Sequence, residues 1–541
     1  MVSSKSRVVS GRYPPPGTSP IADTIRERRG ERGITPLDAN LLHIPHIAKG
    51  YNALLGAVRT EGRLPAILRE AMILRIAALN QAAYEWSHHV EIGKKAGLTT
   101  GQLFILRDTS TPLAPASNLF GAALTAVTKF TDHSTKGPRV PFDVIEAVKT
   151  ELKEVVVAQG TPEGDIEGLI EDYYVEAAMT VAAYNLVSRF LLSTDVAGSS
   201  DVEVPWPVDR KEHFIEIRSF SPAATPTHTI HAVTLKPSDS PNARWIAFSN
   251  SLITSIEMWN YAIPYFLDQG FNLLLHDQRG HGASNLPLVG SGSGTEKRLT
   301  TIPLLASDLA NILAALEIPK PIHSVIGVSQ GGATALAFAN LYGEQTKSVI
   351  ACDTSAKTPQ GNKEAWEERI QVVLGGSNES LGRKYAQKVG IAELADLTLP
   401  RWFPSGSPLS ESAKDFRTGW LASQISNTPV DGFIAGARAL GEYDVLQLSP
   451  SSDSSSAKKL FDTETEHVLL LAGSLDGNGK VGQGLQLLGE EWTSALRSKL
   501  ADGEVKTKEL KIHKVEGSGH LPMVDQPEKF FEIVKDFLLG F

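Results

Sequence analysis

The three residues best suited to catalysis lie far apart in the chain: a serine, an aspartate and a histidine. Ser329 is the centre of a Gly-x-Ser-x-Gly turn that follows an apolar run and precedes an Ala-rich helical pattern. A hydroxyl at such a strand-to-helix corner points out of the sheet, and N–H groups at the helix start can bind a developing oxyanion. The motif therefore predicts a nucleophilic serine.

The histidine and the acid that such a serine requires lie downstream of it. His520 ends a Glu-Gly-Ser-Gly-His segment that follows the last strand-like run. Two aspartates directly follow apolar runs and could orient this histidine: Asp476, which we favour, and Asp353, which stays open as the alternative. We expect Ser329 to attack a carbonyl, His520 to carry the proton and Asp476 to hold the imidazole.

Backbone N–H groups are expected to complete this site as oxyanion donors. One belongs to Gln330, directly after the serine, and the other to the loop after the run 245–248, where we favour Leu252. Removing one such donor typically costs about 3 kcal/mol of transition-state stabilisation. This loop is therefore expected to matter nearly as much as the three side chains.

A second set of ionisable residues lies in the N-terminal half. Glu85 and His89 are four residues apart in a helical pattern, so their side chains share one helix face. Glu70, on the preceding helical pattern, could face the same pocket. A buried Glu–His pair can work as acid and base, but on spacing alone a structural i,i+4 hydrogen bond is favoured.

The bulk composition sets the class of protein that must position these residues. A chain of 541 residues is long enough for two or three domains, and 42% hydrophobic with 21% charged residues is typical of a globular protein. A net charge of −9 argues against a nucleic-acid partner. The single cysteine excludes a disulfide framework and a Cys-x-x-Cys site. Without a signal-like segment or an apolar run of about 18 residues, we expect a cytoplasmic enzyme with no membrane partner.

The periodicity of apolar residues changes near residue 200 and divides the chain. We expect a flexible N-terminus over 1–39, an all-α domain over 40–194, a linker over 195–209 and an α/β domain over 210–541, with a helical cap at about 362–447. Apolar runs predict buried parallel strands at 245–248, 272–276, 323–326, 348–352 and 467–472. The predicted fold class is an all-α domain followed by a doubly wound α/β sheet with a helical cap.

Five segments of the C-terminal half carry a more specific pattern: residues 248–252, 276–284, 353–355, 401–403 and 431–440. Together they resemble the 3-oxoadipate enol-lactonases of the α/β-hydrolase superfamily. The resemblance implies a small anionic enol-lactone as substrate, opened to a 3-oxo diacid, with Arg401 and Trp402 near the substrate. The chain departs from the family at Ile253, where a glycine is usual.

The segment around Glu85 and His89, followed by Gly97, resembles the carboxymuconolactone decarboxylase and alkylhydroperoxidase-like family. The cysteines of the peroxidase branch are missing, since Ala82 and Glu85 stand at those positions. The resemblance thus implies a decarboxylase, with Glu85 and His89 as acid and base groups and with Glu70 and His88 lining the pocket. It also implies a homo-oligomer, and a reaction that needs neither metal nor organic cofactor.

The two resemblances describe consecutive reactions, because the product of the decarboxylase is the substrate of the lactonase. We therefore expect a bifunctional enzyme that decarboxylates 4-carboxymuconolactone and hydrolyses 3-oxoadipate enol-lactone. One alternative is a hydrolase acting on another lactone or ester, whose helical domain serves oligomerisation or a divergent reaction. The other is a ligand-binding protein that keeps the fold without activity.

Overall fold

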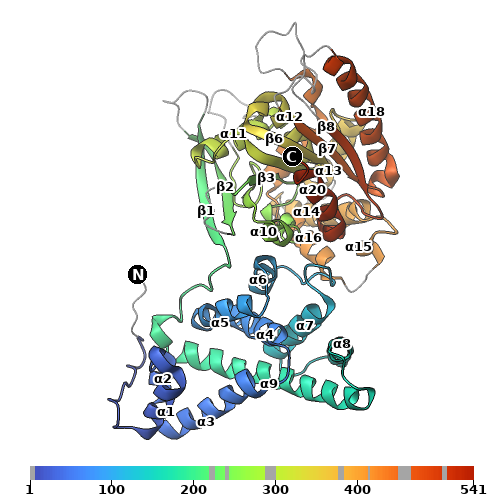
Figure 1. The fold of residues 1–541 in the computed structure, drawn as a ribbon. Coiled ribbons are helices and arrows are strands. Elements are labelled where there is room, and N and C mark those ends of the chain that lie inside the picture. Colours follow the sequence, from blue (N-terminus) through green and yellow to red (C-terminus); the bar gives the residue numbers. More distant parts are fainter. Residues whose placement is uncertain are drawn as a thin grey trace. The chain divides into compact units, whose positions relative to one another are not determined.

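The computed structural model describes residues 6–218, 226–237, 243–286, 300–375, 383–411, 415–448, 465–501 and 509–541. Two compact units divide the chain, Met1–Pro207 and Val208–Phe541, and the division falls within the segment expected to be a linker. The first unit is helical and the second is built on a sheet (Figure 1). The predicted fold class is confirmed.

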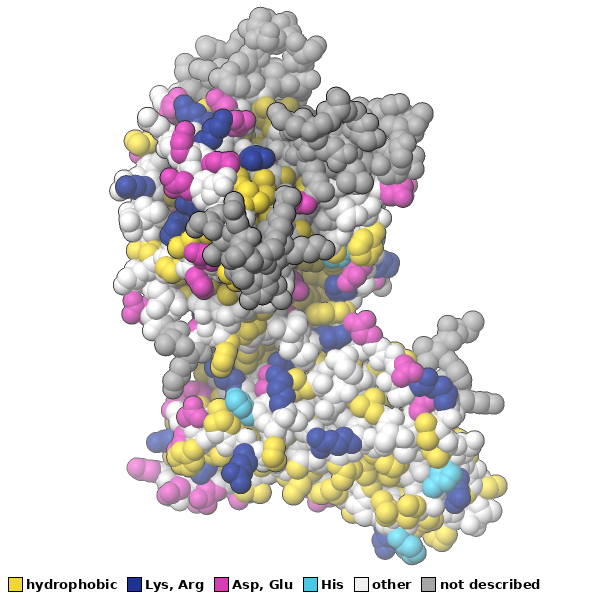
Figure 2. Space-filling view, turned by 180° about the vertical axis from the view of Figure 1, so that it is seen from behind, with side chains coloured by type: hydrophobic (Ala, Val, Ile, Leu, Met, Phe, Trp, Pro, Cys, Tyr) yellow, Lys and Arg dark blue, Asp and Glu magenta, His cyan; other side chains and the backbone are white. Residues whose placement is uncertain are grey.

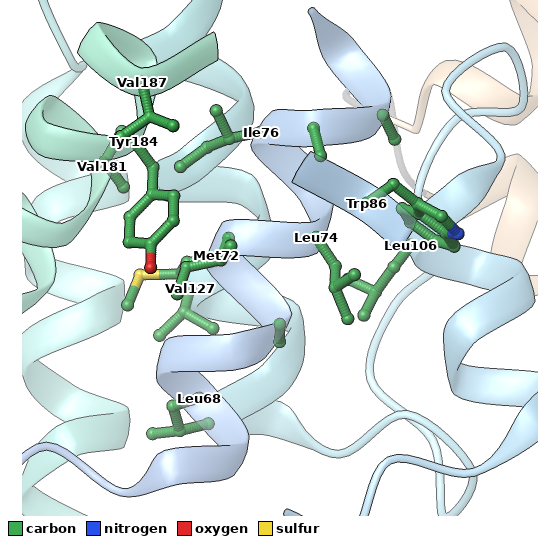
Figure 3. Close-up of a cluster of buried hydrophobic side chains, with 14 of the residues drawn as sticks. Leu68, Met72, Leu74, Ile76, Trp86, Leu106, Val127, Val181, Tyr184 and Val187 are labelled. Carbon is green, nitrogen blue, oxygen red and sulfur yellow. The ribbon is translucent and has the colours of Figure 1, made fainter. Parts of the chain in front are cut away.

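The helical unit is assembled around α4, a helix buried along most of its length. Its apolar residues pack with those of α5, α7 and α9 in one core (Figure 3). The helices are α1 (Pro20–Arg29), α2 (Pro36–Leu41), α3 (Pro45–Gly56), η2 (Ala57–Glu61), α4 (Ala66–Leu79), α5 (Ala83–Lys95), α6 (Thr100–Arg107), α7 (Ala122–Lys136), α8 (Phe142–Ala158) and α9 (Ile166–Ser193).

The N-terminal segment differs from the flexible tail expected over 1–39. Helix α1 is capped by the Ser19 side chain, and its Ala22 and Ile25 are buried in the core of the helical unit. Helix α2 begins with a capping box in which Thr35 and Asp38 bond each other's backbone N–H groups. These caps and two buried side chains are enough to hold a mostly polar segment in place.

Helix α9 is long and apolar enough, by length and composition alone, to cross a membrane, whereas the apolar runs of the sequence predict no such segment. Half of its most apolar window is nevertheless buried within the protein. Tyr184 on this helix lies among Met72, Val181 and Val187 in the core of the helical unit (Figure 3). The helix therefore has a packing role, and a cytoplasmic location stays a prediction.

The second unit contains an eight-stranded sheet in the order β1-β2-β4-β3-β5-β6-β7-β8 (Figure 1). Strands β1, β2 and β4 pair antiparallel, and the pairs from β4 through β3 to β8 are parallel. The strands are β1 (Asp209–Arg218), β2 (Pro226–Lys236), β3 (Trp245–Ser249), β4 (Asn272–His276), β5 (Ile322–Val328), β6 (Thr346–Cys352), β7 (His467–Gly473) and β8 (Glu509–Val515).

A helical insertion separates β6 from β7, within the range expected for a cap. Its helices are α13 (Asn362–Val373), α14 (Arg383–Trp402), α15 (Pro408–Glu411), α16 (Phe416–Ser426) and α17 (Val430–Gly441). The remaining helices of this unit are α10 (Ile263–Asp268), α11 (Ile302–Ala315), α12 (Gln330–Tyr342), α18 (Lys480–Ala501), α19 (Pro522–Asp525) and α20 (Pro527–Leu538).

Candidate active sites

The serine turn lies where β5 passes into α12. Ser329 has φ +57° and ψ −116°, a combination that costs free energy in any residue with a side chain. Its N–H donates to the carbonyl of Cys352 at 2.9 Å. A Cβ at Gly327 would lie 1.9 Å from the carbonyl oxygen of Gly331, and a Cβ at Gly331 2.0 Å from that of Ser249. Both glycines are therefore needed for this turn.

Neighbouring strands deliver the other predicted residues to the same edge of the sheet. Ser329, Asp353, Asp476 and His520 follow β5, β6, β7 and β8, which pair in parallel in that order. The carboxyl ends of parallel strands meet at one edge. Backbone bonds connect the loops there, since the N–H of Asp353 donates to the carbonyl of Leu471 at 2.9 Å.

His520 and Asp476 form the hydrogen bond that the sequence analysis expects of them. Nδ1 of His520 lies 2.7 Å from Oδ2 of Asp476, and the side chains are 15% and 8% exposed. The imidazole also stacks on the Trp402 ring, with 5.7 Å between the ring centroids. The backbone N–H of His520 donates to the Trp402 carbonyl at 2.7 Å. Within the described residues the Ser329 hydroxyl has no hydrogen-bond partner. The hydrogen bond between a nucleophilic hydroxyl and its base often forms only once substrate is bound.

Asp353, the alternative acid, lies near the bonded pair of His520 and Asp476. Its Oδ1 accepts the N–H of Gly473 at 2.8 Å, while its buried Oδ2 accepts no hydrogen bond from the residues that the structure describes. Burial and the charge of Asp476 raise the pKa of Asp353 well above its ordinary value, which favours the protonated acid, a form that can donate a hydrogen bond to Asp476.

The same three side chains are the ones in this site that could ligate a metal ion. One ligand atom each of Asp353, Asp476 and His520 lies within 4.8 Å of the others. Two of these side chains, His520 and Asp476, already bond each other, which is the arrangement expected of a base and its orienting acid.

The predicted oxyanion donors lie under helix α17 of the cap. Leu252 is buried after β3, the strand that pairs with β5, and Gln330 opens α12. Gln330 donates its side-chain N–H to the carbonyl of Gly436 at 2.8 Å, and a Cβ at Gly436 would lie 2.4 Å from Leu252 Cδ1. Ile253 has φ +64°, a left-handed conformation that explains why glycine suits this position.

Two arginines of the cap bring positive charge toward this site. Arg401, at the end of α14, is exposed and lies within electrostatic reach of both Asp476 and Arg369. Burial, with the nearby charge of Arg401, lowers the pKa of Arg369 to about 10. Neither arginine has an ion-pair partner in the part of the chain that the structure describes. Sequence reasoning proposed Arg401 for the site and gave Arg369 no role.

The helical unit brings its predicted acid and base residues into one buried cluster, but the expected pair is not bonded. Nδ1 of His89 lies 2.7 Å from Oε2 of Glu70, and Glu85 accepts the hydroxyl of Ser188 at 2.9 Å. Burial raises the pKa of Glu85 well above its ordinary value and lowers the pKa of His89. These directions favour the protonated acid at Glu85 and the neutral imidazole at His89, the form that can donate from Nδ1 to Glu70.

Two further residues differ from the expectation. His88 is exposed, and its ring bonds the backbone carbonyl of Tyr84 at 2.8 Å, so it lies outside the buried cluster. Tyr184 belongs to the cluster but was not predicted, and its hydroxyl lies 3.3 Å from Nε2 of His89. Arg59 donates to the same hydroxyl at 2.7 Å. Both contacts join residues far apart in sequence, so no local spacing signals them.

Two family models match the chain. The model of the alpha/beta hydrolase family covers residues 248–533, and that of the carboxymuconolactone decarboxylase family covers residues 45–129. The first match spans the serine turn, both aspartates, His520 and the cap.

Two relatives are 3-oxoadipate enol-lactonases of Acinetobacter baylyi. 3-Oxoadipate enol-lactonase 2 is 31% identical over 200 residues, which are 37% of this chain and 64% of the relative. The chain thus spans less than two thirds of that protein. 3-Oxoadipate enol-lactonase 1 is 26% identical over 303 residues, 55% of this chain and 89% of the relative. Among solved structures, the enol-lactonase from Burkholderia xenovorans LB400 is 22% identical with a TM-score of 0.42, covering 58% of this chain and 97% of that one.

Proposed function

This chain belongs to the alpha/beta hydrolase family, and we propose that its serine hydrolase site opens a small anionic enol-lactone. Ser329 attacks the ring carbonyl as His520 removes the hydroxyl proton, and Asp476 stabilises the imidazolium that forms. The N–H groups of Gln330 and Leu252 hold the oxyanion. His520 then gives the proton to the leaving enolate oxygen, and water releases the acyl group by the reverse sequence.

The observation that supports an anionic substrate is the pair of cap arginines that lack ion-pair partners. Arg369 and Arg401 repel each other, and neither forms an ion pair among the described residues. A carboxylate between them would remove this repulsion and accept charge-assisted hydrogen bonds. A lactone carrying a carboxylate arm meets that requirement, and the relatives named for 3-oxoadipate enol-lactone support this identity.

Hydrolysis of 3-oxoadipate enol-lactone by the purified chain tests this proposal. Wild type should hydrolyse the lactone and be labelled by a fluorophosphonate at Ser329, whereas Ser329→Ala should lose both properties. Ser423→Ala, an exposed serine on the cap helix α16, is the matched control and should behave as wild type. Hydrolysis of other lactones without this one would favour the alternative substrate, and an unlabelled Ser329 would indicate a binding protein.

For the helical unit we propose decarboxylation of 4-carboxymuconolactone. The bond between the ring and its carboxylate breaks, carbon dioxide leaves, and the electron pair enters the conjugated lactone as a dienolate. Glu85 supplies the proton that this dienolate takes up on carbon, so one proton is consumed for each carbon dioxide. The burial of Glu85, which raises its pKa well above the ordinary value, supports this role, since an acid is useful here only if it holds its proton near neutral pH.

Release of carbon dioxide from 4-carboxymuconolactone measures this second activity. Glu85→Gln keeps the size of the side chain and the hydrogen bond with Ser188 but cannot give up a proton, so release should fall by at least about a hundredfold. Glu91→Gln, an exposed position on the same helix, should leave the rate unchanged. Wild type that releases no carbon dioxide would refute the proposal and leave the helical unit a structural role.

Self-association through the helical unit completes the proposal. Val175, Met179 and Leu186 are exposed on helix α9, at 61%, 45% and 48%. Their spacing places them along one side of the helix. Figure 2 shows hydrophobic side chains gathered over this unit, in the lower part of the view. A second copy of the chain would cover such an apolar surface.

A further inference from the structure

Arg59 differs from the other arginines buried in the helical unit. Arg75 pairs with Asp132 at 2.6 Å, and Arg107 pairs with Glu203 at 2.9 Å. Arg59 is half-buried, yet it has no ion-pair partner in the part of the chain that the structure describes. Its one hydrogen bond runs from Nε to the hydroxyl of Tyr184 at 2.7 Å. The terminal nitrogens of the guanidinium are therefore left for another acceptor.

The segment that carries Arg59 is irregular. Residues Ala57–Glu61 form η2, a single π-helical stretch that continues α3. Stretches of this kind are rare and concentrate at functional sites. The stretch turns Arg59 toward Tyr184 of α9, although the chain on either side of it is exposed or half-exposed.

Unused hydrogen-bonding capacity gathers around this arginine. Oε1 of Glu85 and the hydroxyl of Tyr51 are buried atoms without partners among the described residues, and both side chains lie within electrostatic reach of Arg59. Glu85 is 2% exposed. Buried polar atoms nearly always have partners. The Tyr51 hydroxyl and a protonated Glu85 can both donate, so these two orphans beside a cation without an ion-pair partner indicate a ligand that supplies acceptors.

The cation is also connected to the acid and base residues. Arg59 donates to the hydroxyl of Tyr184, which lies 3.3 Å from Nε2 of His89, and Nδ1 of His89 bonds Glu70 at 2.7 Å. Because the tyrosine oxygen accepts from Arg59, its own proton points to His89. A group bound by Arg59 would therefore lie next to both His89 and Glu85.

We propose that Arg59 binds a carboxylate of a small organic acid and holds it against Glu85 and His89. This inference rests on the proposed function of the helical unit and names the group that its substrate must carry. The bound carboxylate is the one that the product retains, because a cation on the departing carboxylate would stabilise it and oppose its loss. A planar guanidinium with two free nitrogens matches such a carboxylate with two hydrogen bonds.

Binding of a non-reacting analogue tests the inference. The analogue is the saturated lactone with both carboxylates, which cannot lose carbon dioxide because no conjugated double bond accepts the electron pair. Calorimetric titration of the full chain should show that Arg59→Gln weakens its binding about tenfold or more. Any binding in the other unit contributes equally to both titrations.

Three comparisons make the result specific. The analogue whose acetate arm is an amide should bind wild type and Arg59→Gln equally weakly, and Arg59→Lys should recover part of the affinity for the acid. Arg63→Gln, at an exposed arginine in the next turn of chain, should bind as wild type. Equal affinity of wild type and Arg59→Gln for the diacid would overturn the inference. If Arg59→Gln loses affinity for the diacid but wild type releases no carbon dioxide from 4-carboxymuconolactone, only the proposed reaction is overturned.

Discussion

Replacement of Asp353 by asparagine separates the two acids that the sequence left open. If Asp353 holds a proton, asparagine reproduces it closely. The amide oxygen accepts the N–H of Gly473, as Oδ1 does now at 2.8 Å, and the amide N–H replaces the carboxylic proton toward Asp476. The free energy of unfolding near neutral pH should then change by no more than about 0.5 kcal/mol.

Alanine at this position should behave differently. Asp353→Ala leaves the buried N–H of Gly473 and one side of Asp476 without a partner, which should cost about 1–3 kcal/mol of stability. Asp476→Asn should leave the fold intact but present the wrong partner to Nδ1 of His520, so lactone hydrolysis should fall by about 10⁴.

The pH dependence of the stability tests the protonation of Asp353 independently. The pKa of Asp353 is raised in the folded state above its ordinary value of 3.8. Its contribution to stability is therefore full below that value and is lost as the pH rises through the folded pKa. Asp353→Asn cannot lose a proton, so it should be more stable than wild type on the alkaline side.

The assays are chemical denaturation over a range of pH and initial rates of hydrolysis of 3-oxoadipate enol-lactone. A near-normal rate is expected for Asp353→Asn beside a severe loss for Asp476→Asn. Equal loss of activity in the two variants would refute the assignment of Asp476, rather than Asp353, as the acid that orients His520.

Three other predictions follow from particular contacts. Glu85→Gln should remove the alkaline fall in stability that ionisation of Glu85 produces, since the folded pKa is raised above 4.5; denaturation at several pH values shows it. Gly519→Ala places a Cβ 1.9 Å from the carbonyl oxygen of Trp402 and should lower hydrolysis at least tenfold. Gly484→Ala, with open space at its Cβ, is the control and should leave the rate unchanged. Met179→Glu should dissociate an oligomer formed through α9, as light scattering after gel filtration would show; an unchanged mass would exclude this surface.

The sheet could be predicted from the sequence because its central strands are buried on both faces. β4 has the predicted bounds, β5 extends its predicted run at both ends, and β6 extends its run at the start. Such strands are continuous apolar runs bounded by turns, a signal that needs no knowledge of distant contacts. The chain order of serine, acid and histidine followed from the same runs.

Long-range contacts could not be predicted in the same way. The i,i+4 spacing of Glu85 and His89 suggested a mutual bond, but their partners, Ser188 and Glu70, come from other helices. Arg59 lies 125 residues from Tyr184, so neither residue carried a local signal. The choice between Asp353 and Asp476 also depended on which side chain reaches the imidazole, a distance that only the folded chain has.

The fate of 4-carboxymuconolactone labelled in its ring carboxylate tests the central claim most directly. The full chain should release labelled carbon dioxide and 3-oxoadipate in equal amounts, and Ser329→Ala should release the same carbon dioxide but stop at the enol-lactone. Failure of the wild-type chain to release labelled carbon dioxide, or formation of 3-oxoadipate by Ser329→Ala at the wild-type rate, would contradict the account.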